Sequence, residues 1–206
     1  MKTEILPTTA PNALQYACDV LRYGGLVAFP TDTVYGVGAL AFHREAVLRL
    51  YTVKGRSTDK AIAVLLGRET DLAQVASELS PAARQLAAKF WPGSLTLVVT
   101  KNPQLPEAVS PLPSVGVRMP DHEFARRLLT QTGPMAVTSA NRSGEPNALT
   151  ATDVLEQLSG RIELVLDGGR VPGGVPSTVV DCTGPVPQVL RAGPVTAADI
   201  AAAVAG

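Results

Sequence analysis

The chain has 206 residues, of which 46% are hydrophobic and 4% aromatic, a composition typical of a globular fold with an aliphatic core. Its 18 lysines and arginines balance 18 aspartates and glutamates, so the net charge would not steer the protein to nucleic acid or to a membrane. Basic residues nevertheless outnumber acidic ones between residues 44 and 68, which indicates either a local anionic ligand or a solvated helix face.

Cysteine content and apolar runs bear on the compartment. Cys18 and Cys182 are the only cysteines, too few for a cysteine metal site, and we expect both as buried thiols. The N-terminal segment has no signal-type apolar core, and no apolar run approaches the ~20 residues of a membrane span. The sequence therefore predicts a cytoplasmic protein without membrane contact.

The first half of the chain predicts helices that alternate with short apolar strands. Gly24-Gly25 and Gly55 follow runs of apolar residues at helical spacing, and Pro81 suits the first turn of a helix. The expected helices cover 11–22, 44–55 and 81–91, and the expected strands cover 26–29, 61–66 and 94–100.

The second half continues the alternation after a proline-rich loop at 101–113. Asp121 is the expected N-cap of a helix that begins after the strand "SVGVRM". Further strands are expected at 135–138, 163–166, 177–181 and 187–190, with a short helix after a polar loop at 139–149 and an Ala-rich helix at the end. No linker or internal repeat marks a second domain. The prediction is one α/β domain, residues 1–206, with a mixed sheet.

Polar residues cluster directly after the apolar strands, where loops of α/β folds form sites. These segments are 30–36, 54–60, 117–120, 138–144, 173–181 and 189–194. Short hydroxyls can hydrogen-bond a small polar ligand, and arginines can hold phosphates or a carboxylate at two points. The set favours a nucleotide together with an amino acid. Each member also has an ordinary explanation: Thr31 and Thr33 could satisfy turn amides, and Arg118 could lie on the surface.

Two well-known motifs are present only in part, and a third is absent. "GVGALA" (36–41) fits the dinucleotide fingerprint but follows a polar turn instead of a strand. "STDK" (57–60) with "SAN" (139–141) resembles penicillin-binding elements without the later K-T-G. No P-loop sequence occurs, so an ATP site would be of another kind. His43 and His122 are isolated, and His122 is expected to be structural.

Seven motifs occur in order over residues 29–194: "FPTDTVYGVG", "KGR", "WPGSLTLVV", "VGVRMPDH", "TSAN", "STVVD" and "VLRAGP". With this set the chain resembles the YrdC-type threonylcarbamoyl-AMP synthases, most tellingly in its K-x-R and S-x-N elements. The resemblance covers residues 26–194 and implies a YrdC-like domain with a twisted sheet around a deep basic cavity. The implied reaction converts L-threonine, bicarbonate and ATP to threonylcarbamoyl-AMP and pyrophosphate.

The resemblance also implies roles for individual residues. It places Thr33, Arg118, Val137 and Ser177 around the threonine substrate. It places Arg56, Lys60, Ser114, Ser139, Asn141, Asn147 and Arg191 around ATP. Lys54 and Arg56 would be the catalytic residues, offsetting negative charge near the phosphates. Mg²⁺ would enter with ATP, without a metal site built by the protein.

The product would serve the threonylcarbamoyl modification of adenosine 37 in tRNAs that read codons beginning with A. A downstream tRNA threonylcarbamoyl transferase complex would be the partner, with weak RNA contact by this chain. Two alternatives stay open at this stage. One is an RNA-binding or ribosome-maturation factor, which the neutral net charge and the lack of an aromatic stacking pattern disfavour. The other is carbamoyl transfer to a different acceptor.

Overall fold

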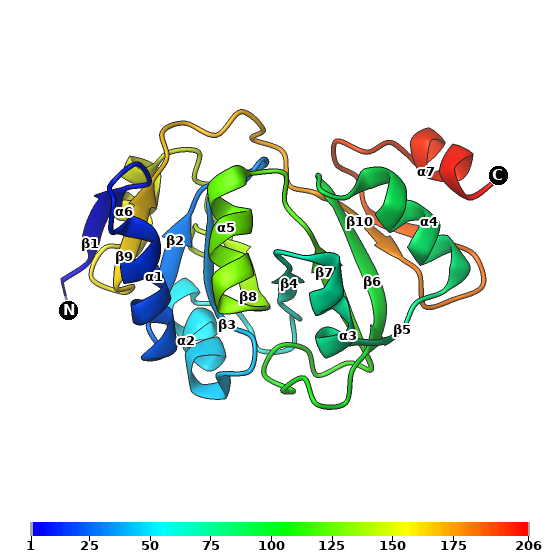
Figure 1. The fold of residues 1–206 in the computed structure, drawn as a ribbon, viewed down its shortest axis with the longest axis horizontal. Helices are drawn as coiled ribbons and strands as arrows, with labels where there is room; N and C mark the ends of the chain where they lie inside the picture. Colours follow the sequence, from blue (N-terminus) through cyan, green and yellow to red (C-terminus); the bar gives the residue numbers. More distant parts are fainter. Residues whose placement is uncertain (1, 206) are drawn as a thin grey trace.

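The computed structural model describes residues 2–205, which are organised around one twisted sheet of 11 strands (Figure 1). The strand order is β1-β9-β2-β3-β8-β4-β7-β6-β10-β11, and β5 lies off this path, paired with the last two residues of β6. The sheet contains both parallel and antiparallel strand pairs, which confirms the predicted mixed sheet. The strands are β1 (Glu4–Pro7), β2 (Val27–Phe29), β3 (Gly36–Leu40), β4 (Ala63–Leu65), β5 (Ala76–Glu78), β6 (Leu95–Lys101), β7 (Ser114–Arg118), β8 (Met135–Ser139), β9 (Leu164–Asp167), β10 (Thr178–Asp181) and β11 (Gln188–Arg191).

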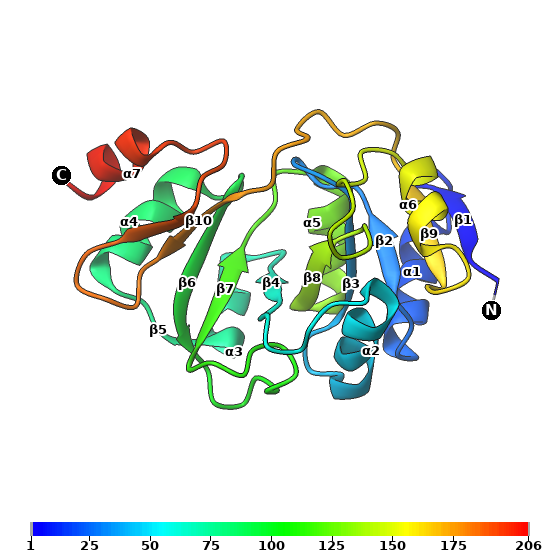
Figure 2. The ribbon, with the colours of Figure 1, turned by 180° about the vertical axis from the view of Figure 1, so that it is seen from behind.

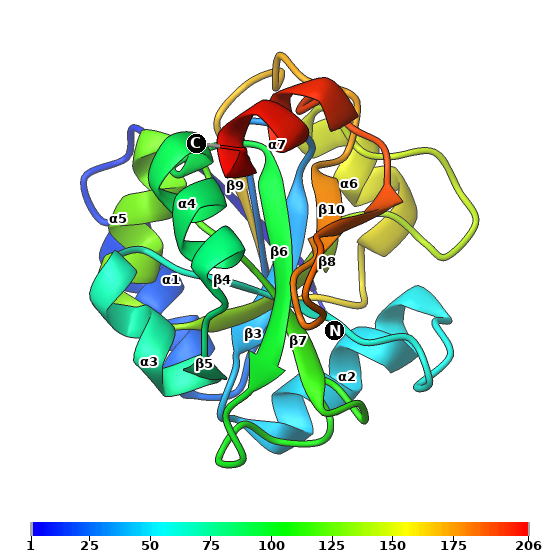
Figure 3. The ribbon, with the colours of Figure 1, turned by 90° about the vertical axis from the view of Figure 1, so that its right-hand side faces the viewer.

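Helices cover both faces of this sheet. Seen along the sheet, α1, α3, α4 and α5 lie on one side, and α2 and α6 lie on the other (Figure 3). The helices are α1 (Ala13–Arg22), α2 (Arg44–Lys54), α3 (Leu72–Val75), α4 (Pro81–Phe90), α5 (Glu123–Thr132), α6 (Ala151–Leu158) and α7 (Ala197–Val204), with a 3-10 turn at Glu69–Asp71. None of the helices in residues 2–205 has the length and apolar character needed to cross a membrane.

Two apolar clusters form the core. The smaller one packs α1 and α5 against β2, β8 and β9 through side chains such as Leu21, Phe29, Leu128, Met135 and Leu164. The larger one occupies the rest of the sheet and both of its faces. Because most strands are covered on both faces, they are apolar throughout, as expected for buried strands.

Helix ends follow the sequence signals with one exception. Gly55 ends α2 in the left-handed conformation, at φ 62°, as predicted. The predicted cap of α5 was wrong: His122, not Asp121, accepts the bond from the amide of Ala125, at 3.3 Å from Nδ1. His122 has extended backbone angles that aim its ring at the first turn, whereas Asp121 stays exposed. The structural role expected for His122 is thereby confirmed.

The segment "GVGALA" is a strand and not the start of a helix. β3 pairs antiparallel with β2 and with β8, so the dinucleotide fingerprint has no structural basis here. Its glycines permit close packing on β8: a Cβ at Gly36 or Gly38 would lie 2.8 Å from a methyl group of Val137. Cys18 and Cys182 are free and buried, as expected, and burial raises the pKa of Cys182 to about 11.

Candidate functional site

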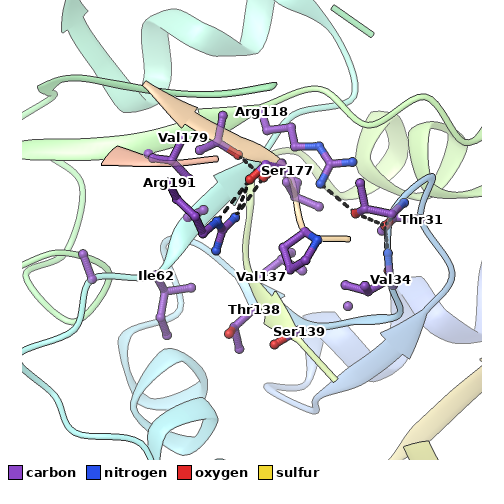
Figure 4. A pocket seen from close by; sticks show the side chains of 18 of the residues that line it. Thr31, Val34, Ile62, Arg118, Val137, Thr138, Ser139, Ser177, Val179 and Arg191 are labelled. Carbon is purple, nitrogen blue, oxygen red and sulfur yellow. Dashed lines mark hydrogen bonds between the residues drawn. The ribbon is translucent and has the colours of Figure 1, made fainter. Parts of the chain in front are cut away.

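A cavity of about 350 Å³ opens at the middle of the sheet (Figure 4). It lies between one half of the sheet, which contains β3 and β8, and the other half, which contains β6 and β10. Three arginines line it: Arg56 from the loop after α2, Arg118 from the end of β7 and Arg191 from the end of β11. The lining residues include short hydroxyls and aliphatic side chains, and among residues 2–205 none of them is acidic. The cavity is therefore suited to an anionic ligand.

The turn after β2 gives its two threonines different tasks. Thr31 Oγ1 donates to the carbonyl of Val34 at 2.6 Å and accepts from the amide of Thr33 at 3.2 Å. Thr31 therefore closes the turn, which is the ordinary explanation considered above. Thr33 is buried in the same turn, but its Oγ1 accepts a bond from Arg118 Nη1 at 3.0 Å and lines the cavity.

Arg118 is a buried arginine fixed at three points. Its Nε donates to the carbonyl of Gly93 at 2.9 Å, its Nη1 contacts Thr33, and its Nη2 forms an ion pair with Asp32. The side chain is 7% exposed. Burial lowers the pKa of Arg118, and the charge of Asp32 opposes that effect. A guanidinium carries five hydrogens, so two remain for a carboxylate in the cavity.

Arg191 holds the other side of the cavity through Ser177. Its Nε and Nη2 both donate to the carbonyl of Ser177, at 3.1 and 2.8 Å, and Nη2 also reaches Ser177 Oγ at 3.2 Å. Ser177 Oγ lies 2.7 Å from Oγ1 of Thr96 on β6. These contacts join β6, β11 and the segment before β10 beside the cavity (Figure 4).

Lys54 is buried behind the cavity and binds the loop that follows β8. Its Nζ donates to the backbone carbonyls of Ser139 and Asn141, and the side chain does not line the cavity. Burial, together with the nearby charge of Arg56, lowers the pKa of Lys54 to about 7. The amide of Ser143 in turn donates to the carbonyl of Lys54 at 2.9 Å. The K-x-R and S-x-N elements are thus physically joined.

Arg56 belongs to the K-x-R element and Asn141 to the S-x-N element, and both side chains bind nearby backbone. Arg56 Nη2 donates to the carbonyl of Ala61 at 2.9 Å, which keeps the guanidinium at the cavity wall. Asn141 is buried and its Nδ2 donates to the carbonyls of Arg142 and Glu145, at 3.0 and 2.6 Å. Its Oδ1 has no hydrogen-bond partner within residues 2–205.

The structure brings together most residues that the sequence singled out. Eight of them line the cavity: Thr33, Arg56, Arg118, Val137, Ser139, Asn147, Ser177 and Arg191. Lys54 and Asn141 are buried next to it, whereas Lys60 is exposed and Ser114 is half-buried on β7, both away from the lining. The sequence analysis missed Thr96, which also lines the cavity. The signal was available, because residues two apart in a strand share a face and Thr96 therefore faces the same side as Val98.

The connection from β9 to β10 passes across the top of the molecule, over the turn that carries Thr33 (Figure 2). The amide of Gly174 donates to the carbonyl of Thr33 at 2.7 Å, and a Cβ at Gly173 would lie 2.6 Å from that carbonyl oxygen. The hydroxyl of Tyr35 donates to Gly169 at 2.7 Å and accepts from Gly168 at 3.1 Å. The connection is therefore attached to the turn at its start and again at Gly174.

Replacing Tyr35 by phenylalanine is expected to loosen this connection. The hydroxyl is buried and makes two backbone bonds, so Tyr35→Phe should cost about 1–2 kcal/mol of unfolding free energy. Urea denaturation measures that loss, and faster hydrogen exchange at Gly168 would locate it. Tyr16→Phe is the matched control, because its hydroxyl is exposed where it binds Glu4. Equal losses in both variants would contradict the attachment.

Comparisons with known proteins agree with this arrangement. Residues 19–193 match the family Sua5_yciO_yrdC, described as "Telomere recombination". The chain belongs to this family. The threonylcarbamoyl-AMP synthase of Bacillus subtilis is 40% identical over an alignment of 208 positions, which covers 98% of this chain and 59% of the relative. A Mycobacterium leprae relative is 41% identical over 196 residues, and these cover 95% of this chain and 89% of the relative.

A solved structure of the same family has the same fold. The crystal structure of Pyrococcus abyssi Sua5 complexed with L-threonine superposes with a TM-score of 0.90 at 40% identity, over 93% of this chain and 57% of that one. This confirms the YrdC-like fold inferred from the motifs. The chain spans just over half the length of the Bacillus and Pyrococcus relatives.

Proposed function

We propose that this protein is an L-threonylcarbamoyladenylate synthase, a nucleotidyltransferase that uses L-threonine, bicarbonate and ATP. The observation that carries the proposal is the position of Arg118 with Thr33, beside a cavity that two further arginines line. Such a cavity can hold a carboxylate at one end and phosphates at the other. Family relatives named threonylcarbamoyl-AMP synthase, and a relative solved with L-threonine, support the choice of substrates.

The residues present suit a reaction that needs no protein nucleophile. The threonine amine and CO₂ form a carbamate as the nitrogen loses a proton; with bicarbonate, that proton leaves together with the bicarbonate hydroxyl as water. A carbamate oxygen then attacks the α-phosphorus of ATP, the bond to the β-phosphate oxygen breaks, and pyrophosphate leaves. The protein positions the two substrates and offsets negative charge as it develops. Arg118 and Thr33 hold the amino acid, while Arg56 and Arg191 face the phosphates.

Mg²⁺ is proposed as a companion of ATP. Within residues 2–205 no group of three or more His, Cys, Asp or Glu side chains is placed to hold a metal ion. A triphosphate with its own Mg²⁺ fits such a cavity, since this ion keeps several waters and needs few protein ligands. The Mg²⁺ would neutralise phosphate charge. The cytoplasmic location and the delivery of the product to a tRNA threonylcarbamoyl transferase complex belong to the same proposal.

The test measures pyrophosphate release from Mg-ATP and bicarbonate, with and without L-threonine, and identifies the nucleotide product by mass. Threonine-dependent release with the mass of threonylcarbamoyl-adenylate is the expected result. If carbamoyl phosphate supports pyrophosphate release and threonine does not, the result would contradict the proposal and favour carbamoyl transfer. Absence of both activities, with an RNA affinity that falls steeply with salt, would favour the RNA-binding alternative.

A further inference from the structure

Two hydroxyl groups meet beside Arg191 in the lining of the cavity. Thr96 Oγ1 and Ser177 Oγ are 2.7 Å apart, and both side chains are buried. Ser177 Oγ also lies 3.2 Å from Nη2 of Arg191. Either hydroxyl could be the donor in the Thr96–Ser177 bond, and the direction decides what Ser177 offers to a ligand.

The orientation of Thr96 is fixed by its neighbours on the sheet. A Cβ at Gly116 would lie 3.2 Å from Thr96 Cγ2 and 3.6 Å from the Cβ of Ala63. The methyl group of Thr96 therefore points across Gly116 toward β4, into space that only a glycine on β7 leaves open. Since methyl and hydroxyl occupy different staggered positions on the same carbon, this packing aims the hydroxyl at Ser177.

Counting hydrogens favours one direction of the bond. Arg191 can only donate, so it occupies one lone pair of Ser177 Oγ. Within residues 2–205, Ser177 Oγ is the one hydrogen-bond partner of Thr96 Oγ1, and donation to it would satisfy the buried Thr96 hydrogen. Ser177 then accepts two bonds, and its own hydrogen stays available on the side of the cavity.

We propose that Thr96 is a positioning residue that makes Ser177 a hydrogen-bond donor to the carboxylate of the amino-acid substrate. Thr96 touches Ser177 and acts through it, while Arg118 supplies the charge that binds the same carboxylate. The inference rests on the proposed function, because it names how one residue of that site is prepared. It extends the substrate contacts to a residue on β6 that the motifs did not single out.

The test replaces Thr96 by valine, which keeps the branched shape and the methyl group over Gly116. Without the Thr96 hydrogen, Ser177 no longer has a fixed direction, so the KM for threonine should rise about tenfold. The kcat at saturating threonine and the KM for ATP should change less than about twofold. Thr96→Ser restores the hydroxyl and should return the KM to within about threefold of the wild type.

A double-mutant cycle with Ser177→Ala separates positioning from general damage. If Thr96 acts through Ser177, Thr96→Val adds no further increase in KM once Ser177 is alanine. An unchanged or lower KM in Thr96→Val alone would overturn the proposal, because Ser177 would then be the donor to Thr96. Additive effects would overturn it as well. If circular dichroism shows that the valine variant is unfolded, Thr96→Ala supplies the same comparison with a smaller side chain.

The turnover of the wild-type protein distinguishes a failure of the proposed function from a failure of the role proposed for Thr96. A wild-type protein that releases no pyrophosphate in response to threonine contradicts the proposed function before any variant is compared. A wild-type protein with threonine-dependent turnover, whose Thr96→Val variant has the same KM, contradicts only the role of Thr96.

Discussion

Arg118→Ala is expected to lower kcat/KM for threonine about a thousandfold, which corresponds to about 4 kcal/mol at 1.36 kcal/mol per decade. The guanidinium has two hydrogens free for a carboxylate after its contacts with Gly93, Thr33 and Asp32. Charged hydrogen bonds of this kind contribute about 1.5–3 kcal/mol each. Steady-state rates over a range of threonine concentrations measure the loss, and a decrease below tenfold would contradict the assignment.

The same substitution leaves the Asp32 carboxylate, whose side chain is 15% exposed, without its cationic partner. We therefore expect Arg118→Ala to lose about 3 kcal/mol of unfolding free energy as well. Adding Asp32→Asn removes the unpaired charge, so the double variant should recover much of this stability without recovering threonine turnover. That result separates substrate recognition from folding. Arg127→Ala, an exposed arginine on α5, should leave both quantities unchanged.

The sequence predicted the layout of the fold because its signals are local. Gly55 ends a helix in a conformation that favours glycine. The alternation of apolar residues in segments such as "SLTLVVT" predicts a strand. β1 and β5 carry no such signal: each is short, mostly exposed and held by one neighbouring strand. β3 was not predicted as a strand because it contains two glycines. Glycine is needed there because Val137 on a neighbouring strand leaves no room for a Cβ.

The site was predictable as a set of motifs but not as a set of contacts. Which polar residues face the cavity depends on pairs that are far apart in the chain. Asp32 was not singled out, since only the fold brings it to Arg118 from 86 residues away. Thr96 acquires its significance from Gly116 and Ser177, on two other segments. Lys54 was predicted to offset negative charge near the phosphates, yet it is 3% exposed and donates to two backbone carbonyls.

Lys54→Met is the second substitution with a large expected effect. It removes both donors from the carbonyls of Ser139 and Asn141 and leaves them buried without a partner. We expect a loss of about 2–4 kcal/mol of unfolding free energy, together with a fall of about a hundredfold in kcat/KM for ATP as the loop with Ser139 loosens. Lys60→Met is the control for stability, because that side chain is exposed on the neighbouring segment.

The stability difference between the wild type and Lys54→Met should depend on pH. The pKa of Lys54 is about 7 in the folded protein and 10.5 at its ordinary value, so between these limits the unfolded chain binds more protons. Unfolding free energy of the wild type therefore rises with pH in this window, by about 1 kcal/mol per unit, and the variant lacks this rise. A neutral amine still has two hydrogens for the two carbonyls, so the loop remains held. Urea denaturation at pH 6.5, 8 and 9 measures the difference. A gap that stays constant or narrows toward pH 9 would show that the buried amine keeps its proton throughout.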